Sequence, residues 1–261
     1  MEVKYEVNQD LFFTITDSDI TGVSTTNNNN NKEIISILEL DNIDKLNVII
    51  DGKKLTIDEK WLFSKKVQVV TKLTNINFIK SVEDYMDYII KKNLIQMKNP
   101  DKKKESSLKI VGLSPEYLER EYYNLSSSEK FQVSLAISLL SNPSILILDN
   151  PFTYLDLHQE KELIKLLQRL KEQYKKMIVI VDDNCNKLYK YTNKIIFVKN
   201  NHTILEGDTA ETYTRVDFLK RHSFSIPDIV EMTYKAKRTK GIKIIYHKDI
   251  RDLIKDIYKH V

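Results

Sequence analysis

The chain has 261 residues and only five glycines, whereas an average globular protein of this length carries about 18. Its net charge of +4, from 41 basic and 37 acidic residues, is too balanced to indicate nucleic acid or a membrane surface as partner. The single cysteine, Cys185, excludes an internal disulfide and favours a reducing compartment. No glycine-rich phosphate loop and no apolar run of roughly 18 residues occurs, so we expect a soluble, cytosolic globular protein.

The N-terminal part has the pattern of short strands joined by polar turns. Four runs have strand composition: Leu11–Ile15, Ile20–Ser24, Val48–Ile50 and Val67–Val70. Asp51 and Gly52 form a predicted turn. Five consecutive asparagines, Asn27–Asn31, predict a loop before a helix that opens near Glu33.

The next segment, from Ser81 to Leu118, changes to a helical pattern. Val82, Met86 and Ile89 recur at helical spacing. The polar run Lys98–Lys104 contains a proline and predicts a loop. We expect a small helical subdomain inserted between strands.

The central segment has the pattern of alternating helices and buried parallel strands. Small polar residues before Glu129 predict a helix start. The apolar runs Ile145–Leu148 and Met177–Val181 each end in a carboxylate, and the amphipathic helix His158–Lys175 lies between them. A hairpin follows, from Lys194 to Leu205. This order predicts a parallel α/β sheet.

The last fifty residues are mostly helical in pattern. We expect helices over Asp217–Arg221, Ile226–Lys237 and Lys248–His260, and a short strand over Lys243–Tyr246. The basic run Lys235–Lys240 fits a solvated helix end better than a nucleic-acid patch.

Three closely spaced motifs resemble the nucleotide-binding domain of ABC transporters. Leu125–Glu129 resembles the LSGGQ signature, Ile145–Pro151 the Walker B strand, and Tyr154–Asp156 the D-loop. The tail Gly207–Tyr213, followed by Ser225–Pro227, is most similar to the energy-coupling-factor subgroup. That resemblance implies an ATPase that works as a dimer under a membrane scaffold and powers vitamin or metal uptake.

The resemblance also implies a fold and a division of the chain. The fold is α/β, a P-loop NTPase-like nucleotide-binding domain with an inserted helical subdomain and a small C-terminal extension. Residues 1–80 form the N-terminal β/α part of the core, 81–126 the helical subdomain ending in the signature, and 127–210 the rest of the core with Walker B and D-loop. Residues 211–261 form the C-terminal extension with dimer contacts.

The family's phosphate loop falls on Thr25–Lys32, where the expected residues are absent. Asn27 and Asn30 occupy the cradle, Asn31 lies where the phosphate lysine belongs, and Lys32 where the Mg²⁺-binding hydroxyl belongs. A one-residue slip would let Lys32 serve as the phosphate lysine, but Glu33 then offers no hydroxyl. The resemblance therefore implies a degenerate loop.

Three further catalytic positions are altered, although the Walker B Asp149 is kept as a Mg²⁺ ligand through water. Asn150 replaces the catalytic glutamate and has no ionisable base. Asp182 lies at the switch-histidine position, and Lys72 near the Q-loop glutamine. We expect hydrolysis at this chain's own Walker site to be lost.

The signature side is better preserved. Ser126 would donate its hydroxyl to a γ-phosphate on a partner, and Asp156 keeps the D-loop carboxylate. Ser127 and Ser128 replace the Gly-Gly pair, while Glu129 adds a negative charge. The alternative is that Ser126 and Asp156 only cap helices.

The resulting hypothesis is a degenerate ATP-binding subunit of an energy-coupling-factor-type importer, peripheral on the inner face of the cell membrane. Its implied partners are a second ABC ATPase and a transmembrane scaffold, and its implied cofactors are ATP and Mg²⁺. Alternatives are a divergent but active ATPase using Lys32, and a regulatory or scaffold pseudo-ATPase; nucleic acid ranks last. Tyr5 is the candidate adenine-stacking aromatic.

Overall fold

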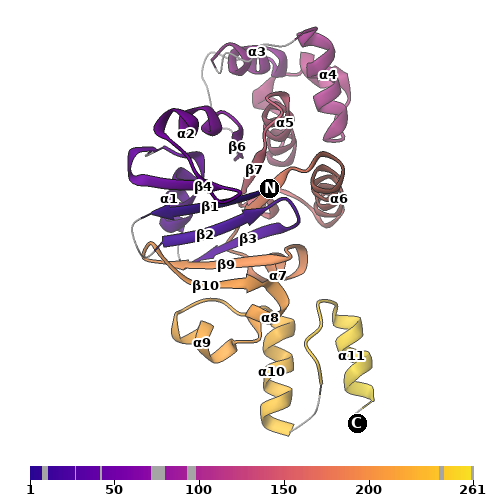
Figure 1. Ribbon diagram of the computed structural model, residues 1–261. Helices are drawn as coiled ribbons and strands as arrows, with labels where there is room; N and C mark the ends of the chain where they lie inside the picture. The colour runs from indigo at the N-terminus through magenta and orange to yellow at the C-terminus, as the bar shows by residue number, and fades with distance from the viewer. Residues whose placement is uncertain are drawn as a thin grey trace.

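The computed structural model describes residues 1–7, 11–26, 28–41, 43–71, 80–92, 98–240 and 244–259. Two sheets form its centre, the helical pair α3 and α4 lies at one end, and α10 and α11 lie at the other (Figure 1). Asn27 and Lys72 fall outside the described residues.

The smaller sheet has four antiparallel strands in the order β2-β1-β4-β5. Its strands are β1 (Glu2–Val7), β2 (Leu11–Thr16), β4 (Leu46–Ile50) and β5 (Lys53–Lys54). Asp51 and Gly52 join β4 to β5 with positive φ angles of 48° and 83°, the conformation that tight hairpin turns require. The predicted turn is confirmed, whereas β1 was not expected.

The larger sheet has six strands in the order β10-β9-β3-β8-β7-β6. Its strands are β3 (Ile20–Thr25), β6 (Val67–Val70), β7 (Ile145–Asp149), β8 (Met177–Val181), β9 (Lys194–Lys199) and β10 (His202–Asp208). Every neighbouring pair is parallel except β9 and β10, which form the predicted hairpin. The carboxyl ends of β3, β6, β7 and β8 therefore meet at one edge of the sheet.

Helices cover both faces of this sheet and complete the core. The helices are α1 (Asn28–Glu39), α2 (Ile57–Ser64), α3 (Val82–Lys92), α4 (Pro100–Ile110), α5 (Ser127–Leu140), α6 (Leu157–Tyr174), α7 (Cys185–Tyr191), α8 (Thr209–Tyr213), α9 (Val216–Arg221), α10 (Asp228–Lys240) and α11 (Ile250–Tyr258). Short 3₁₀ turns lie at η1 (Ile43–Lys45), η2 (Pro115–Glu119), η3 (Tyr122–Asn124) and η4 (Pro151–Tyr154). The mixed α/β fold that the sequence predicts is confirmed.

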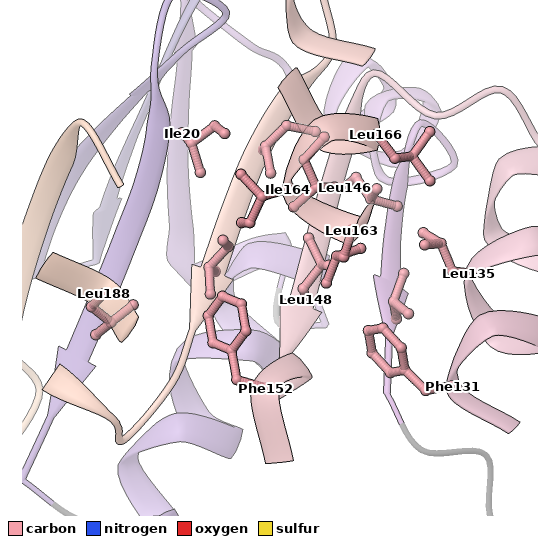
Figure 2. Close-up of a cluster of buried hydrophobic side chains, with 14 of the residues drawn as sticks. Ile20, Phe131, Leu135, Leu146, Leu148, Phe152, Leu163, Ile164, Leu166 and Leu188 are labelled. Carbon is pink, nitrogen blue, oxygen red and sulfur yellow. The ribbon is translucent and has the colours of Figure 1, made fainter. Parts of the chain in front are cut away.

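The core forms two clusters, one on each face of the larger sheet. In Figure 2, Leu146 and Leu148 of β7 face Phe131 and Leu135 of α5 and residues of α6. The other cluster packs α1 and the smaller sheet against the opposite face, through side chains such as Ile34. Because β7 and β8 are covered on both sides, their sequences are continuous apolar runs.

Three sequence-based expectations about local structure were wrong. Asn28–Asn31 open helix α1 rather than forming a loop, since asparagine is tolerated in a first helical turn. Helix α4 begins at Pro100 inside the expected loop 98–104, because proline suits the first helical position. Residues 244–246 lie in no strand.

The burial of Lys104 explains why the sequence predicts a loop at the start of α4. Its side chain is only 2% exposed and forms ion pairs with Glu83 and Asp87 of α3 and with Asp101 of α4, at 2.7, 3.0 and 2.9 Å. This lysine therefore joins the two helices instead of facing solvent. In the described part of the chain, no helix combines the length and the apolarity needed to cross a membrane.

Candidate functional site

The strand ends bring most of the predicted Walker-side residues together. Asn31 lies in the first turn of α1, directly after β3, while Asp149 ends β7 and Asp182 follows β8. A hydrogen-bonded network links these strand ends, and we call it the strand-end network. Its members are Thr25, Asn31, Thr71, Asp149, Asn150 and Asp183.

Asn31 occupies the buried centre of this network. Its Oδ1 accepts a hydrogen bond from Thr25 Oγ1 at 2.5 Å, and its Nδ2 donates to Asp183 Oδ1 at 2.7 Å. The residue is 2% exposed, whereas Lys32 beside it is exposed. Asn31, and not Lys32, therefore holds the place that faces the strand ends. The side chain of Asn30 lies outside the described residues.

Asn150 links the ends of β7 and β8. Its backbone is left-handed, with φ 46° and ψ 49°, a region that asparagine tolerates better than most residues. The amide Nδ2 donates to Asp149 Oδ1 at 2.8 Å, and its Oδ1 accepts from the Asp183 backbone N–H at 3.3 Å. Thr71 Oγ1 donates to the other Asp149 oxygen, Oδ2, at 3.3 Å. Both functional groups of Asn150 are thus used in holding the strand ends.

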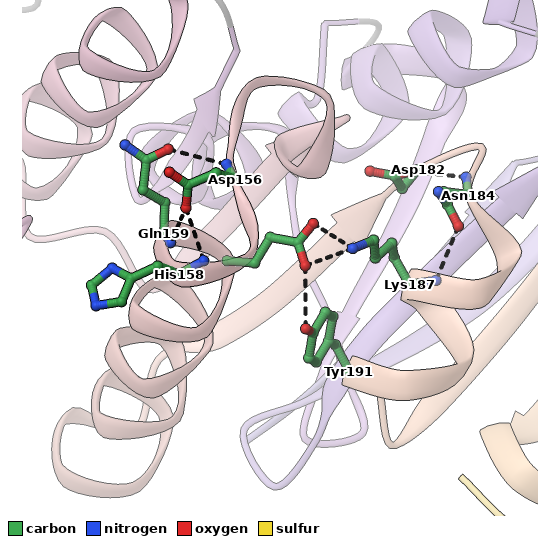
Figure 3. Close-up of polar contacts among 8 residues, drawn as sticks. Asp156, His158, Gln159, Asp182, Asn184, Lys187 and Tyr191 are labelled. Atoms are coloured by element: carbon green, nitrogen blue, oxygen red, sulfur yellow. Dashed lines mark hydrogen bonds and ion pairs between the residues drawn. The ribbon is translucent and has the colours of Figure 1, made fainter. Parts of the chain in front are cut away.

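Asp182 places a third carboxylate beside Asp149 and Asp183. Its side chain is 3% exposed and accepts a hydrogen bond from the Asn184 backbone N–H at 2.8 Å (Figure 3). Oδ2 has no hydrogen-bond partner among the described residues. Burial raises the pKa of Asp182 to about 6, and the charges of Asp183 and Asp149 add to this rise. No lysine or arginine in the described ranges forms an ion pair with these three carboxylates.

A buried ion pair joins α6 to α7, the helix that follows Asp182 in the chain. Glu160 of α6 pairs with Lys187 of α7 through both carboxylate oxygens, and Tyr191 Oη donates to Glu160 Oε2 at 3.3 Å (Figure 3). Sequence reasoning missed this contact because Glu160 lies among exposed charges of an amphipathic helix. Only its spacing with Leu163 and Leu167 on the apolar face signals burial.

The signature residues form a capping box at the start of α5. Ser126 Oγ accepts from the Glu129 backbone N–H at 3.2 Å, and Glu129 Oε2 accepts from the Ser126 backbone N–H at 2.8 Å. Tyr117 donates to Glu129 Oε1 at 2.6 Å, and this bond, with those from Ser126, lowers the pKa of Glu129. Ser126 and Ser127 are exposed, and Ser128 Oγ lies 3.2 Å from Ser126 Oγ.

Asp156 forms an equivalent capping box at the start of α6. Its Oδ1 accepts from the backbone N–H groups of His158 and Gln159, both at 2.8 Å, and Gln159 Oε1 accepts from the Asp156 N–H at 3.1 Å (Figure 3). The capping roles considered from sequence are thus present. Within the described residues, no hydrogen bond joins Ser126 or Asp156 to the strand-end network.

Tyr5 does not fit the role of an adenine-stacking aromatic. It is fully buried in β1, and its ring stacks on Phe13 with a centroid distance of 5.3 Å. Its face is therefore covered by the protein core. Val3 and Tyr5 are two residues apart and therefore lie on the same face of β1, a spacing that could have indicated that Tyr5 is buried.

A family profile described as ABC transporter matches residues 34–153. Together with the α/β fold, this match places residues 34–153 in the class of ABC-type ATP-binding cassettes. Within that class, the chain is 25% identical over 229 residues to the energy-coupling factor transporter ATP-binding protein EcfA2 of Mycoplasma mobile, covering 85% of this chain and 74% of that one. It is 26% identical over 203 residues to EcfA2 of Clostridium perfringens, covering 76% and 70%.

Residues 34–153 match the family of ABC transporter ATP-binding domains, and the chain is homologous to energy-coupling-factor ATP-binding subunits. Solved structures agree on the fold. CbiO1 of Clostridium perfringens, part of the ABC transporter complex cbiONQ, superposes with a TM-score of 0.67 at 19% identity over 89% of this chain and 98% of that one. A dimeric ATP-binding cassette in a post-hydrolysis state with ADP and Pi gives 0.66 at 20% identity, covering 79% and 98%.

Proposed function

We propose that this chain is a degenerate ATP-binding subunit of an energy-coupling-factor-type importer, which pairs with a competent ATPase and couples its ATP cycle to membrane transport. The observation that carries the proposal is the position of Asn31. A neutral amide lies where the family has its phosphate lysine, and both ends of that amide are already bonded to Thr25 and Asp183.

Electrostatics argue against a nucleotide at this chain's own Walker side. The fold class binds nucleotide, typically with Mg²⁺, but here Asp149, Asp182 and Asp183 gather at the strand ends, and no lysine in the described residues forms an ion pair with them. A carboxylate about 4 Å from a phosphate charge is repelled by about 4 kcal/mol at an effective dielectric constant of 20. Asp149 retains the carboxylate that would hold Mg²⁺ through water, whereas Asp182 and Asp183 add negative charge beside it that disfavours a triphosphate.

The signature side retains groups that suit a phosphate on the partner subunit. Ser126 is exposed; its Oγ accepts a bond from Glu129 N–H and lies 3.2 Å from Ser128 Oγ, so a phosphate would compete with Ser128 Oγ for the hydroxyl proton. Helix α5 begins at Ser127 and directs its positive end the same way. Glu129 is held back by Tyr117, and Arg120 lies 3.5 Å from it.

The C-terminal extension, residues 211–261, offers a surface for pairing. On α11, Leu253 is buried, while Ile250, Ile254 and Tyr258 are exposed and recur every four residues along one face. Such an unpartnered apolar stripe marks a protein interface. We assign it to contact with the second ATPase.

The helical subdomain, residues 81–126, is assigned to contact with the transmembrane scaffold at the inner face of the cell membrane. Lys104 ties α3 to α4, so the pair moves as one unit. Tyr88 of α3 is exposed, as a partner-facing aromatic would be in the isolated chain. This assignment follows from the kinship with transporter ATPases.

The direct test is ATP turnover by the purified chain with Mg²⁺. We expect no turnover above background, and no change with Lys32→Ala. Turnover that Lys32→Ala abolishes would support the divergent active ATPase instead. A scaffold role without transport would show as failure to co-purify with any multi-span membrane protein in mild detergent.

A further inference from the structure

A pocket lies apart from the strand-end network, and none of the residues of that network lines it. Its volume is about 650 Å³, and it is lined by residues at the end of α4, on α5 and along α6 as far as Arg169. This volume falls within the range of about 300–1,000 Å³ that small-molecule sites occupy. Neither the Walker-side nor the signature residues line it.

The floor of this pocket is apolar and rigid. Phe131 and Leu135 of α5 and Leu163 and Leu166 of α6 line it, and all four side chains are buried in the core. Ile110 lies at the margin and is 43% exposed, so one wall offers apolar surface to an occupant. An apolar part of a ligand would therefore contact mainly Ile110 and the small exposed surfaces of Leu163 and Leu166.

The rim of the pocket is basic. Lys109 of α4 and Lys165 and Arg169 of α6 line it, together with His158, and Glu162 is the single carboxylate in the lining. Glu162 already pairs with Lys165 at 2.7 Å. Lys109 and Arg169 form no ion pair in the described part of the chain, so two uncompensated cations from two different helices face the same floor.

From this arrangement we propose that the pocket binds a small amphiphilic anion, with an apolar chain or ring on the floor and a carboxylate or phosphate group at Lys109 and Arg169. Helix-end electrostatics account for Lys109 alone, because a cation suits the last turn of α4. They do not account for Arg169, which lies within α6, nor for the apolar floor between the two cations. An acidic amphiphile satisfies both features.

An occupant would touch the elements that carry the signature and the D-loop. Phe131 on the floor stacks with Tyr154 at a centroid distance of 6.1 Å, and Leu155, which also lines the pocket, directly precedes Asp156. Binding would thus restrain the start of α6 relative to α5. Any effect on a partner's ATP turnover rests on the proposed function, whereas binding itself does not.

The test measures binding of decanoate, below its micellar concentration, to the purified full chain by titration calorimetry without ATP. We expect saturable binding of one molecule per chain. Decanol, which lacks the charge, should bind at least tenfold more weakly. The variant Lys109→Glu/Arg169→Glu should also bind decanoate at least tenfold more weakly, because it reverses both cations.

A matched variant controls for overall charge. Lys103→Glu/Lys161→Glu changes one exposed lysine on each of α4 and α6 outside the pocket, with the same change in net charge, and should alter the affinity less than twofold. Equal weakening by both variants would overturn the proposal, as would equal affinity for decanol or no saturable binding. Binding that appears only with phosphatidylglycerol vesicles would also overturn it, in favour of a membrane surface.

Discussion

At the scale of single residues, the strand-end network uses its amide groups for internal hydrogen bonding. The polar side-chain atoms of Asn31 and Asn150 are bonded to Thr25, Asp149 and Asp183. Such a network is satisfied without ligand, and it rigidifies the strand ends because buried polar groups are costly to leave unpaired.

Asn31→Ala should destabilise the fold by about 1–3 kcal/mol, because it removes both hydrogen bonds that the buried Asn31 amide forms with Thr25 and Asp183. Urea unfolding at neutral pH measures this. Lys32→Ala, an exposed change in the same helical turn, is the control and should stay within about 0.5 kcal/mol of the unchanged chain. Equal stability of the two variants would show that the Asn31 network contributes nothing.

Asp182 should make the folded chain less stable as pH rises. Its folded pKa of about 6 lies above the ordinary value of 3.8, so the folded state binds more protons than the unfolded state between about pH 4 and 6. The destabilisation caused by ionising Asp182 in the folded state is absent below this pH window and complete above it. Asp182→Asn keeps an acceptor for the Asn184 N–H and should stabilise the chain by about 1–3 kcal/mol at pH 7.5.

Urea unfolding of Asp182→Asn at several pH values checks this. The stabilisation should shrink towards zero near pH 4, because the carboxyl of the unchanged chain is then protonated as well. A gain that is constant from pH 4 to 7.5 would mean that ionisation of Asp182 is not its source.

At the scale of elements, the sequence could predict those helices and strands whose hydrophobic pattern follows from burial of one face or of both faces. The runs ending in Asp149 and at Val181 are uniformly apolar because helices cover both faces of β7 and β8. The start of α4 could not be predicted, because its central lysine resembles a solvated charge until α3 is packed beside it. Lys104 meets Glu83 and Asp87 only through tertiary contact.

Lys104→Met tests this clamp between α3 and α4. The change keeps most of the side-chain volume but removes the ion pairs to three partly exposed carboxylates, and we expect a loss of about 1–3 kcal/mol. Thermal and urea unfolding measure it, with the exposed Lys103→Met as control. A Lys104→Met variant as stable as Lys103→Met would indicate that packing alone joins the two helices.

At the scale of the whole molecule, the chain has the fold of an ABC cassette, and our proposal assigns different roles to its Walker and signature sides. The order of strands and helices along the chain predicted the parallel sheet, and the family resemblance assigned Asn31, Asp149 and Asp182 to positions of one Walker site. Neither could predict how the amides are oriented, because Asp183 and Thr71 join the network only through the fold. The pocket beside α6 likewise could not be predicted from the sequence, because its lining residues come from separate helices.

ATP turnover by this chain assembled with a competent ATPase partner, with and without Ser126→Arg, tests whether its signature side serves the partner's ATP. If the signature side serves the partner's ATP, the bulky cation should reduce turnover by about 10²–10³-fold, the scale of losing a preorganised donor in a catalytic site. Ser106→Arg, an exposed change on α4, should leave turnover unchanged. Normal turnover with Ser126→Arg in an intact complex would contradict the account.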